Sequence, residues 1–435
     1  MRTSVQSRVV TIALALCAVL PLAAQELPRS APAEVGMSVE RLERLTAALN
    51  AYVTADRLPG AVAMVLRDGQ VVYSQAVGFR DRESASPMRT DAIFRIASQT
   101  KALVSVGIMM LQEDGALLIS NSLSQYLPEF RTTTVASPDG RGGYEIVDAN
   151  RQITLRDLLT HTSGLGYGGG LGGARWDEAD VTGWYFAHRR EPIRETVRRI
   201  ADLPMLAHPG QAFVYGYSTD VLGAVIEVVS GQTLADFLRE RIFEPLDMRD
   251  THFYLPPAQQ GRLATVYNLR DALTRAPDGP GMTTQGEYVE GPRASYSGGA
   301  GLLSTARDYA RFLQMLLNGG ELNGRQLLSP KTVALMTTDH IGNVSDRGFM
   351  QPGMGFGLGF QVRLDVGAVG APGSVGDYGW GGAYHSTYWV DPVEDLVVVY
   401  FTQVIPAANL DDHARLRAMV YSAIMESRSP ATVHD

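Results

Sequence analysis

The segment Ser98-Gln99-Thr100-Lys101 places a hydroxyl and an amine at a spacing that suits nucleophilic catalysis. On a helix, residues three positions apart lie on one face, about one turn from each other. Residues 102–111 are apolar on almost every face, which predicts a central, buried helix. A lysine in its first turn is largely removed from water, which is costly unless the amine is paired or functional. The helix N-terminus adds free N–H groups, so the segment can supply a nucleophile, an amine and one oxyanion donor.

The same spacing fits a second interpretation, in which Ser98 caps the helix and Lys101 extends to the surface. Lysine is rare in this chain, because only Lys101 and Lys331 occur among its 38 basic residues. The position of Lys101 is therefore informative about function, although the segment alone leaves both interpretations open.

Tyr215 is a candidate for the second proton-transferring group. It stands two residues before Tyr217 and shortly before a helix expected over residues 220–229. A neighbouring ammonium favours the phenolate form of a tyrosine, which can accept a serine proton. The alternative is a core tyrosine at the entry to a helix.

A third segment, residues 378–383, reads Tyr-Gly-Trp-Gly-Gly-Ala and leads into an expected strand. Glycines at the start of a strand let a ligand or another backbone approach closely. A simple bulge is the alternative interpretation.

Other catalytic and cofactor motifs are missing from the sequence. It contains no Gly-x-Ser-x-Gly elbow, no His-Glu-x-x-His and no Walker loop. A Gly-x-Gly-x-x-Gly at Gly164, Gly166 and Gly169 has no strand before it, so we interpret it as a flexible loop. The histidines show no helical pairing at metal spacing, so we expect no metal and no cofactor.

The elements that must position these residues follow from periodicity and turn signals. Helices are expected over residues 38–53, 102–112, 220–229, 234–242, 304–317 (capped by Ser304) and 411–425. Hairpins are expected at 61–66 with 70–77, across Asp68-Gly69, and at 385–390 with 396–404. We therefore predict an α/β (α+β) fold. Its antiparallel sheet is built from both chain ends, about 38–95 and 300–428, with a mostly helical insertion over about 96–299.

Composition excludes several classes of protein. The 435 residues are 45% hydrophobic and 19% charged, enough for a large core. The net charge of −8 and the absence of a basic stripe argue against nucleic-acid binding. No later stretch reaches the roughly 18 apolar residues of a spanning helix, so no stable membrane span is expected. Nothing in the sequence indicates an oligomeric state.

The first residues have the pattern of a secretory signal. Arg2 and Arg8 precede an apolar run that ends in Ala23-Ala24, which predicts a signal peptide over residues 1–24. A leader over 25–37 and a catalytic domain over 38–428 would follow. The only cysteine, Cys17, leaves with the signal, so the exported, periplasmic or secreted protein would have no disulfide and no thiol nucleophile.

Together, the three segments resemble the serine β-lactamase and penicillin-binding-protein superfamily, specifically its class C-like branch, and most closely the family VIII carboxylesterases. The order and spacing agree over nearly the whole mature chain. Further similar stretches are residues 58–61, 93–98, 158–165, 297–302 and 389–392.

The resemblance implies a catalytic role for three side chains. Ser98 would be the acylated nucleophile, and Lys101 with Tyr215 would carry the proton network, the first acceptor being undecided between the two. The backbone N–H groups of Ser98 and Ala383 would form the oxyanion hole.

Departures from the family pattern bear on the substrate. Trp380-Gly381-Gly382 stands where class C β-lactamases have Lys-Thr-Gly, and an indole N–H cannot replace an ammonium opposite a carboxylate. Tyr217 stands where many relatives have an asparagine that holds the acyl amide. Both changes favour a neutral acyl ester, with Trp380, Gly381, Gly382 and Tyr217 contacting it.

The sequence therefore predicts an exported serine hydrolase for short- to medium-chain carboxylic esters, acting on a small-molecule substrate. A β-lactamase or D,D-peptidase is the main alternative. An amide hydrolase or acyltransferase would use the same groups, and a non-catalytic binding protein of the same fold is a further alternative.

Overall fold

The computed structural model describes residues 26–428. The expected signal peptide over 1–24 lies outside the described residues. At the start of the described chain, Leu27 is buried and a short 3-10 helix, η1 (Pro32–Val35), precedes the first α-helix.

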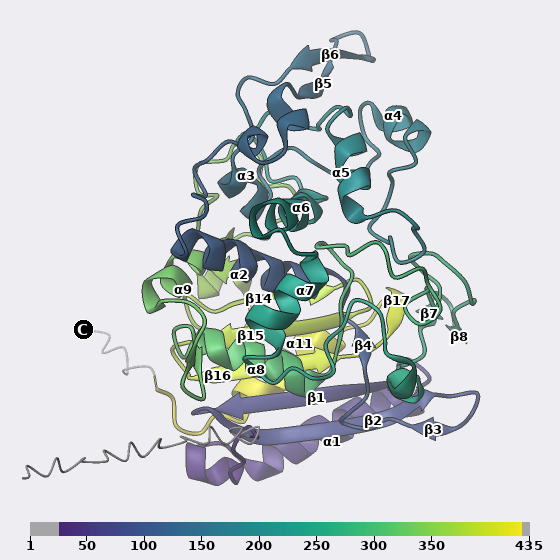
Figure 1. Ribbon diagram of the computed structural model, residues 1–435. Helices are drawn as coiled ribbons and strands as arrows, with labels where there is room; N and C mark the ends of the chain where they lie inside the picture. Colours follow the sequence, from purple (N-terminus) through teal and green to yellow (C-terminus); the bar gives the residue numbers. More distant parts are fainter. Residues whose placement is uncertain (1–25, 429–435) are drawn as a thin grey trace, which may run out of the picture.

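An eight-stranded antiparallel sheet forms the centre of the molecule, in the order β12-β13-β14-β15-β16-β1-β2-β3 (Figure 1). Both ends of the chain contribute to it, as the sequence predicts. The bounds are β12 (Met354–Phe356), β13 (Gln361–Arg363), β14 (Tyr378–Gly382), β15 (Ser386–Asp391), β16 (Leu396–Phe401), β1 (Gly60–Arg67), β2 (Gln70–Asp81) and β3 (Ser86–Pro87).

The first hairpin confirms the turn chemistry of Asp68-Gly69. Both residues have positive φ, 51° and 70°, which is the conformation that a tight two-residue hairpin turn requires. All eight residues of β1 are buried, because both faces of this strand are covered.

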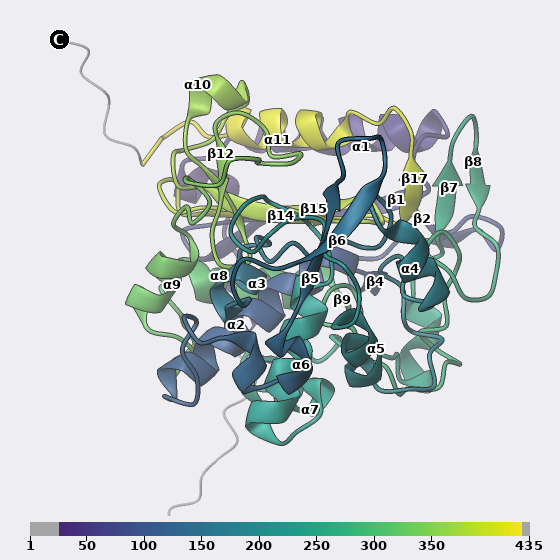
Figure 2. The ribbon, with the colours of Figure 1, turned by 90° about the horizontal axis from the view of Figure 1, so that it is seen from above.

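Helices cover the two faces of the sheet (Figures 1 and 2). On one face, α1 (Val39–Thr54) and α11 (Asp412–Ser422) pack their leucines and valines against Ala61, Ala63 and Val65 of β1. The alternate residues Val62 and Met64 point into the larger core, which includes α2 (Thr100–Glu113) and α8 (Ala306–Leu317). The period-two alternation of the strand thus separates the two layers.

The inserted region carries most of the remaining helices and several small sheets. Its helices are α3 (Leu155–Leu159), α4 (Gly173–Glu178), α5 (Ile193–Ile200), α6 (Ser218–Ser230), α7 (Leu234–Leu238) with the π-turn η5 (Arg239–Phe243), and the 3-10 helices η2 (Ala97–Gln99), η3 (Leu123–Gln125), η4 (Pro128–Arg131) and η6 (Pro257–Arg262). Its short strands are β4 (Phe94–Arg95), β5 (Thr134–Pro138), β6 (Tyr144–Asp148), β7 (Tyr267–Leu269) and β8 (Leu273–Arg275). Towards the C-terminus come β9 (Leu303–Ser304), β10 (Glu321–Leu322), β11 (Arg325–Gln326), α9 (Pro330–Met336), α10 (Val366–Val369) and β17 (Val404–Ala407).

Several element boundaries differ from expectation, and two of the differences have a clear cause. Thr305, not Ser304, caps α8, because Ser304 pairs with Phe94 in the β4–β9 ladder while the Thr305 hydroxyl accepts the N–H of Asp308. The strand expected over 396–404 ends at Phe401, and β17 then pairs with β7 outside the main sheet.

No single helix between residues 26 and 428 is long and apolar enough to cross a membrane. Helix α6 and the segment Leu234–Phe243 meet the length and composition only as a pair bent by 84°.

Candidate active site

Ser98 lies in η2, the single 3-10 turn that leads into α2. The preceding residue, Ala97, is fully buried and has a φ of 43°, a left-handed conformation that a non-glycine residue rarely adopts. This turn places Ser98 at the wall of a cavity of about 700 Å³. The nucleophile predicted from the sequence is therefore accessible to a ligand.

Lys101 is buried, with 2% of its surface exposed, and does not extend to solvent. Its ammonium nitrogen, Nζ, donates to the Tyr167 hydroxyl at 2.8 Å and to the Gly299 carbonyl at 2.7 Å, and lies 3.5 Å from Ser98 Oγ. A lysine ammonium has three N–H donors, and these three oxygens provide one acceptor for each. Lys101 is thus held beside the nucleophile by an organised set of contacts.

Tyr215 joins the same group of residues. Lys101 Nζ lies 4.6 Å from the centre of the Tyr215 ring, and the Trp380 indole N–H donates to the Tyr215 hydroxyl over 2.9 Å. An N–H aimed at a phenol oxygen stabilises negative charge that develops there when the proton leaves. Trp380 therefore contacts a candidate catalytic group as well as the cavity.

The two expected oxyanion donors lie close to each other in space. Ala383 follows β14 and lines the cavity together with Ser98. Gly382 packs directly on the segment before the nucleophile, since a Cβ there would stand 2.5 Å from the Ile96 carbonyl oxygen. Glycine at 382 lets β14 approach this closely, which brings the Ala383 peptide towards the segment that contains Ser98.

Gly381 lines the cavity beside Trp380, whereas Tyr217 does not reach it. Tyr217 is fully buried, stacks on Trp176 with a centroid distance of 5.7 Å, and donates its hydroxyl to the Gly183 carbonyl over 2.5 Å. The expectation that Tyr217 contacts substrate is therefore wrong. The ring packs in the core among aromatic neighbours, including Tyr167, which it contacts edge to face.

Tyr167 is a site residue that sequence reasoning missed. It lies in the glycine-rich loop after α3, which is packed against the core rather than free. A Cβ at Gly216 would stand 2.2 Å from the Leu165 carbonyl oxygen, so glycine allows this loop to lie against the residue next to Tyr215. Burial, with the neighbouring Tyr215, raises the pKa of Tyr167 well above its ordinary value, so its phenol stays protonated beside Lys101.

Asp220 of α6 is the second residue that the sequence did not reveal. It is 1% exposed, and its Oδ1 accepts the Ser297 hydroxyl at 2.6 Å and the Gly299 N–H at 3.0 Å. Gly299 thus joins Asp220 through its N–H and Lys101 through its carbonyl. Burial raises the pKa of Asp220, while Ser297 and the charge of Lys101 act in the opposite direction.

His161 packs behind Tyr215, with their ring centres 4.6 Å apart. The ring is 1% exposed, and burial together with the charge of Lys101 lowers its pKa well below the ordinary value. The imidazole is therefore neutral at pH 7 and adds no second positive charge beside Lys101.

The lining of the cavity is partly aromatic and partly charged. Tyr167, Trp184, Phe349 and Trp380 line it together with Ser98. Arg363 and Arg417 line it too and both pair with Asp377, Arg363 through Nε at 2.8 Å. The two guanidinium groups thus share one carboxylate partner.

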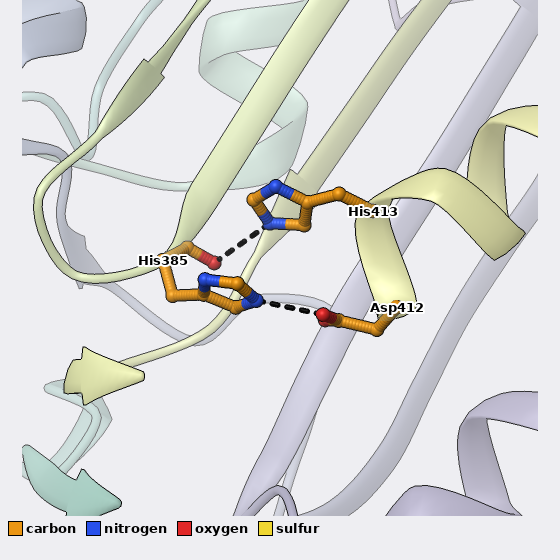
Figure 3. Close-up of side chains that lie close together, drawn as sticks. All are labelled: His385, Asp412 and His413. Carbon is orange, nitrogen blue, oxygen red and sulfur yellow. Dashed lines mark hydrogen bonds and ion pairs between the residues drawn. The ribbon is translucent and has the colours of Figure 1, made fainter. Parts of the chain in front are cut away.

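One cluster near the cavity has metal-ligating side chains. His385, Asp412 and His413 place one donor atom each within 4.8 Å of the others (Figure 3). In the structure, His385 Nε2 is bonded to Asp412 Oδ1 at 2.7 Å, and the two imidazole rings stack 4.0 Å apart at 16°. Nearly parallel rings do not direct their lone pairs at one point, so hydrogen bonding explains this cluster better than ligation.

Fold, cavity and side-chain geometry together agree with one protein family. The chain matches the family described as Beta-lactamase over residues 43–421 and belongs to it. The resemblance predicted from the sequence is thereby confirmed.

Three similar proteins illustrate the range of the family. Esterase EstB of Burkholderia gladioli is 35% identical over 374 residues, covering 82% of this chain and 89% of EstB. Protein Rv1367c of Mycobacterium tuberculosis is 32% identical over 402 residues, covering 89% of this chain and 96% of that protein. The structure of EstCE1, described as a hydrolase with promiscuous acyltransferase activity, superposes with a TM-score of 0.72 at 27% identity, covering 89% of this chain and 99% of EstCE1.

Proposed function

We propose that this protein is a serine carboxylesterase that hydrolyses neutral esters of short- to medium-chain acids through an acyl-Ser98 intermediate. The observation that carries the proposal is the hydrogen bond from Trp380 to Tyr215, in a cavity that also contains Ser98. The similarity to esterase EstB supports the same reaction class.

Acylation would begin with attack of Ser98 Oγ on the ester carbonyl carbon. The serine proton passes to the Lys101–Tyr215 pair, and the amides of Ser98 and Ala383 stabilise the oxyanion. Three acceptors surround Lys101 Nζ, which suits an ammonium without a free lone pair, so we assign the first proton transfer to Tyr215, which enters the step as the phenolate and becomes the phenol. The carbon–oxygen bond to the alcohol then breaks, and the alcohol leaves with that proton.

Deacylation would reverse these roles. A water molecule attacks the acyl carbon, its proton passes to Tyr215, and Ser98 leaves and recovers a proton. The carboxylic acid then dissociates. Each oxyanion donor typically contributes a few kcal/mol to such transition states.

The preference for a neutral substrate follows from the partners that the cationic side chains near Ser98 already have. Lys101 is buried beneath the nucleophile, and both arginines of the cavity pair with Asp377. The one N–H that the Trp380 indole possesses is given to Tyr215. A β-lactam or peptide carboxylate would therefore have to compete with existing partners, whereas an ester has no such requirement.

The test compares p-nitrophenyl butyrate, p-nitrophenyl esters of longer acids and nitrocefin, with wild type and Ser98→Ala. We expect fast ester turnover, slow nitrocefin hydrolysis, and loss of both in the variant. Faster turnover of nitrocefin than of the ester would favour the β-lactamase alternative. Ester turnover that survives Ser98→Ala would contradict the proposal. A fluorophosphonate that adds no mass at Ser98 would favour a binding protein.

We also propose that the protein is exported, because its first 24 residues have the composition of a signal peptide. Expression with the native N-terminus in a Gram-negative host should yield a protein that begins at Gln25. N-terminal sequencing of the periplasmic fraction and the medium measures this, and an intact Met1 would contradict it.

A further inference from the structure

The turn between β14 and β15 contains both Ala383 and His385. In the proposed function, the Ala383 N–H is an oxyanion donor, and the present inference rests on that assignment. The turn is closed by the His385 N–H, which donates to the Gly382 carbonyl over 3.0 Å. The backbone of His385 therefore closes the turn in which the peptide of Ala383 lies.

His385 has a left-handed backbone conformation, with a φ of 60°. A non-glycine residue there costs about 1 kcal/mol or more, so neighbouring contacts must hold it in place. The ring provides such a contact, since its Nε2 is bonded to Asp412 Oδ1 over 2.7 Å. Asp412, the first residue of α11, is fully buried, and its other oxygen accepts the Tyr400 hydroxyl of β16 at 2.8 Å.

His413 adds a second contact on the same side of the turn. Its ring lies flat on that of His385, 4.0 Å away, and its Nε2 lies 3.3 Å from the His385 carbonyl oxygen (Figure 3). Both the side chain and the carbonyl of His385 are therefore held by the first turn of α11.

The opposite side of the turn is tied to the nucleophile. Ser386 accepts the side-chain N–H of Gln99, the residue after Ser98, over 3.2 Å, and Gly382 packs on the Ile96 carbonyl. The turn that carries Ala383 is thus clamped between α11 and the segment of Ser98.

We propose that His385, anchored by Asp412, is a positioning residue that aims the Ala383 N–H into the oxyanion hole. It does not touch the reacting atoms. Its effect should appear in the transition state, where the oxyanion is formed, and not in the binding of the ground-state ester.

Three variants separate the parts of this contact. His385→Phe keeps a flat ring against His413 and removes the nitrogen that meets Asp412. His385→Gln restores an N–H donor, and Asp412→Asn removes the negative charge while retaining an oxygen acceptor. The matched control is His252→Phe, which removes a similar 3.0 Å hydrogen bond, to Gln259, at a residue that does not line this cavity.

Two measurements test the proposal with the full mature chain. For p-nitrophenyl butyrate, we expect kcat of His385→Phe to fall about ten- to hundredfold with KM nearly unchanged, and His385→Gln to recover part of the loss. The affinity for phenylboronic acid, whose tetrahedral adduct with Ser98 places an oxygen in the oxyanion hole, should fall by a similar factor. Asp412→Asn should show a smaller loss in both measurements.

The two readouts also separate this inference from the proposed function. Boronate binding does not require ester turnover, so it tests the role of His385 even if the natural substrate is not an ester. The inference would be overturned if both His385→Phe and His385→Gln showed kinetic constants and a boronate affinity within twofold of those of His252→Phe. If His385→Phe does not fold, as judged by its melting transition, the same comparison of His385→Gln and Asp412→Asn with His252→Phe decides for or against it.

Discussion

Trp380 donates its indole N–H to the hydroxyl of Tyr215 across 2.9 Å, joining the strand β14 to a residue shortly before α6. The contact shows what a tryptophan does at this position. The sequence indicates only that an ammonium is missing, whereas the structure shows what stands in its place: a neutral donor bonded to Tyr215, the proposed general base. A substrate carboxylate would therefore meet an indole whose N–H already has a partner.

The first prediction concerns this hydrogen bond. Trp380→Phe keeps an aromatic surface and removes the N–H, so we expect kcat for p-nitrophenyl butyrate to fall about tenfold, the equivalent of about 1.4 kcal/mol. Trp184→Phe, at the same cavity but without a bond to Tyr215, should change KM more than kcat. Steady-state kinetics of both variants measures the difference. Equal effects on kcat would show that the indole contributes only surface.

Asp220 should be required for turnover, because Gly299 connects it to Lys101. We expect Asp220→Asn to lower kcat at least tenfold, since it removes a buried carboxylate that interacts with the Lys101 ammonium. Asp308→Asn is the matched control, because Asp308 is equally buried but lies at the start of α8. Kinetics together with melting temperatures distinguish the two. If both variants lose stability and keep kcat, Asp220 has only a structural role.

Tyr217 should affect stability and leave selectivity unchanged. Tyr217→Phe removes the hydroxyl that pairs with the Gly183 carbonyl, which we expect to cost about 1–2 kcal/mol of unfolding free energy. Because the ring is fully buried, the ratio of rates for acetate and hexanoate esters should stay as in wild type. Urea unfolding and ester kinetics test these two parts. An altered chain-length preference at unchanged stability would indicate that Tyr217 contacts the substrate.

Local sequence chemistry predicts the elements whose signals lie within a few residues. The Asp68-Gly69 turn, the apolar helix after Lys101 and the spacing of Ser98 and Lys101 are of this kind. The cap of α8 lies one residue beyond the expected position. Ser304 and Thr305 are both good caps, and only a strand partner far along the chain decides between them.

The contacts that organise the site could not be predicted from the sequence. Lys101 meets Tyr167 and Gly299, which lie 66 and 198 residues away along the chain, and no local pattern reports such pairs. Tyr217 shows the converse error, since its position beside Tyr215 suggests a role that its stack on Trp176 prevents. Tertiary packing decides which polar residues near a motif face the cavity.

The pH dependence of stability should be traceable to His413. Burial, followed by the neighbouring His385, lowers the pKa of His413 from 6.5 to about 4. Between these values the unfolded chain binds a proton that the folded chain does not, so stability is fully present above pH 6.5 and falls as the pH drops towards 4. We expect His413 alone to remove about 2 kcal/mol of unfolding free energy between about pH 7.5 and about pH 5.

His413→Phe keeps a flat ring against His385 without a titrating group, so its urea midpoint should fall less over this range than that of wild type. Measurements at the upper pH provide the packing control, and parallel pH slopes for the two proteins would assign the acid sensitivity to other buried histidines.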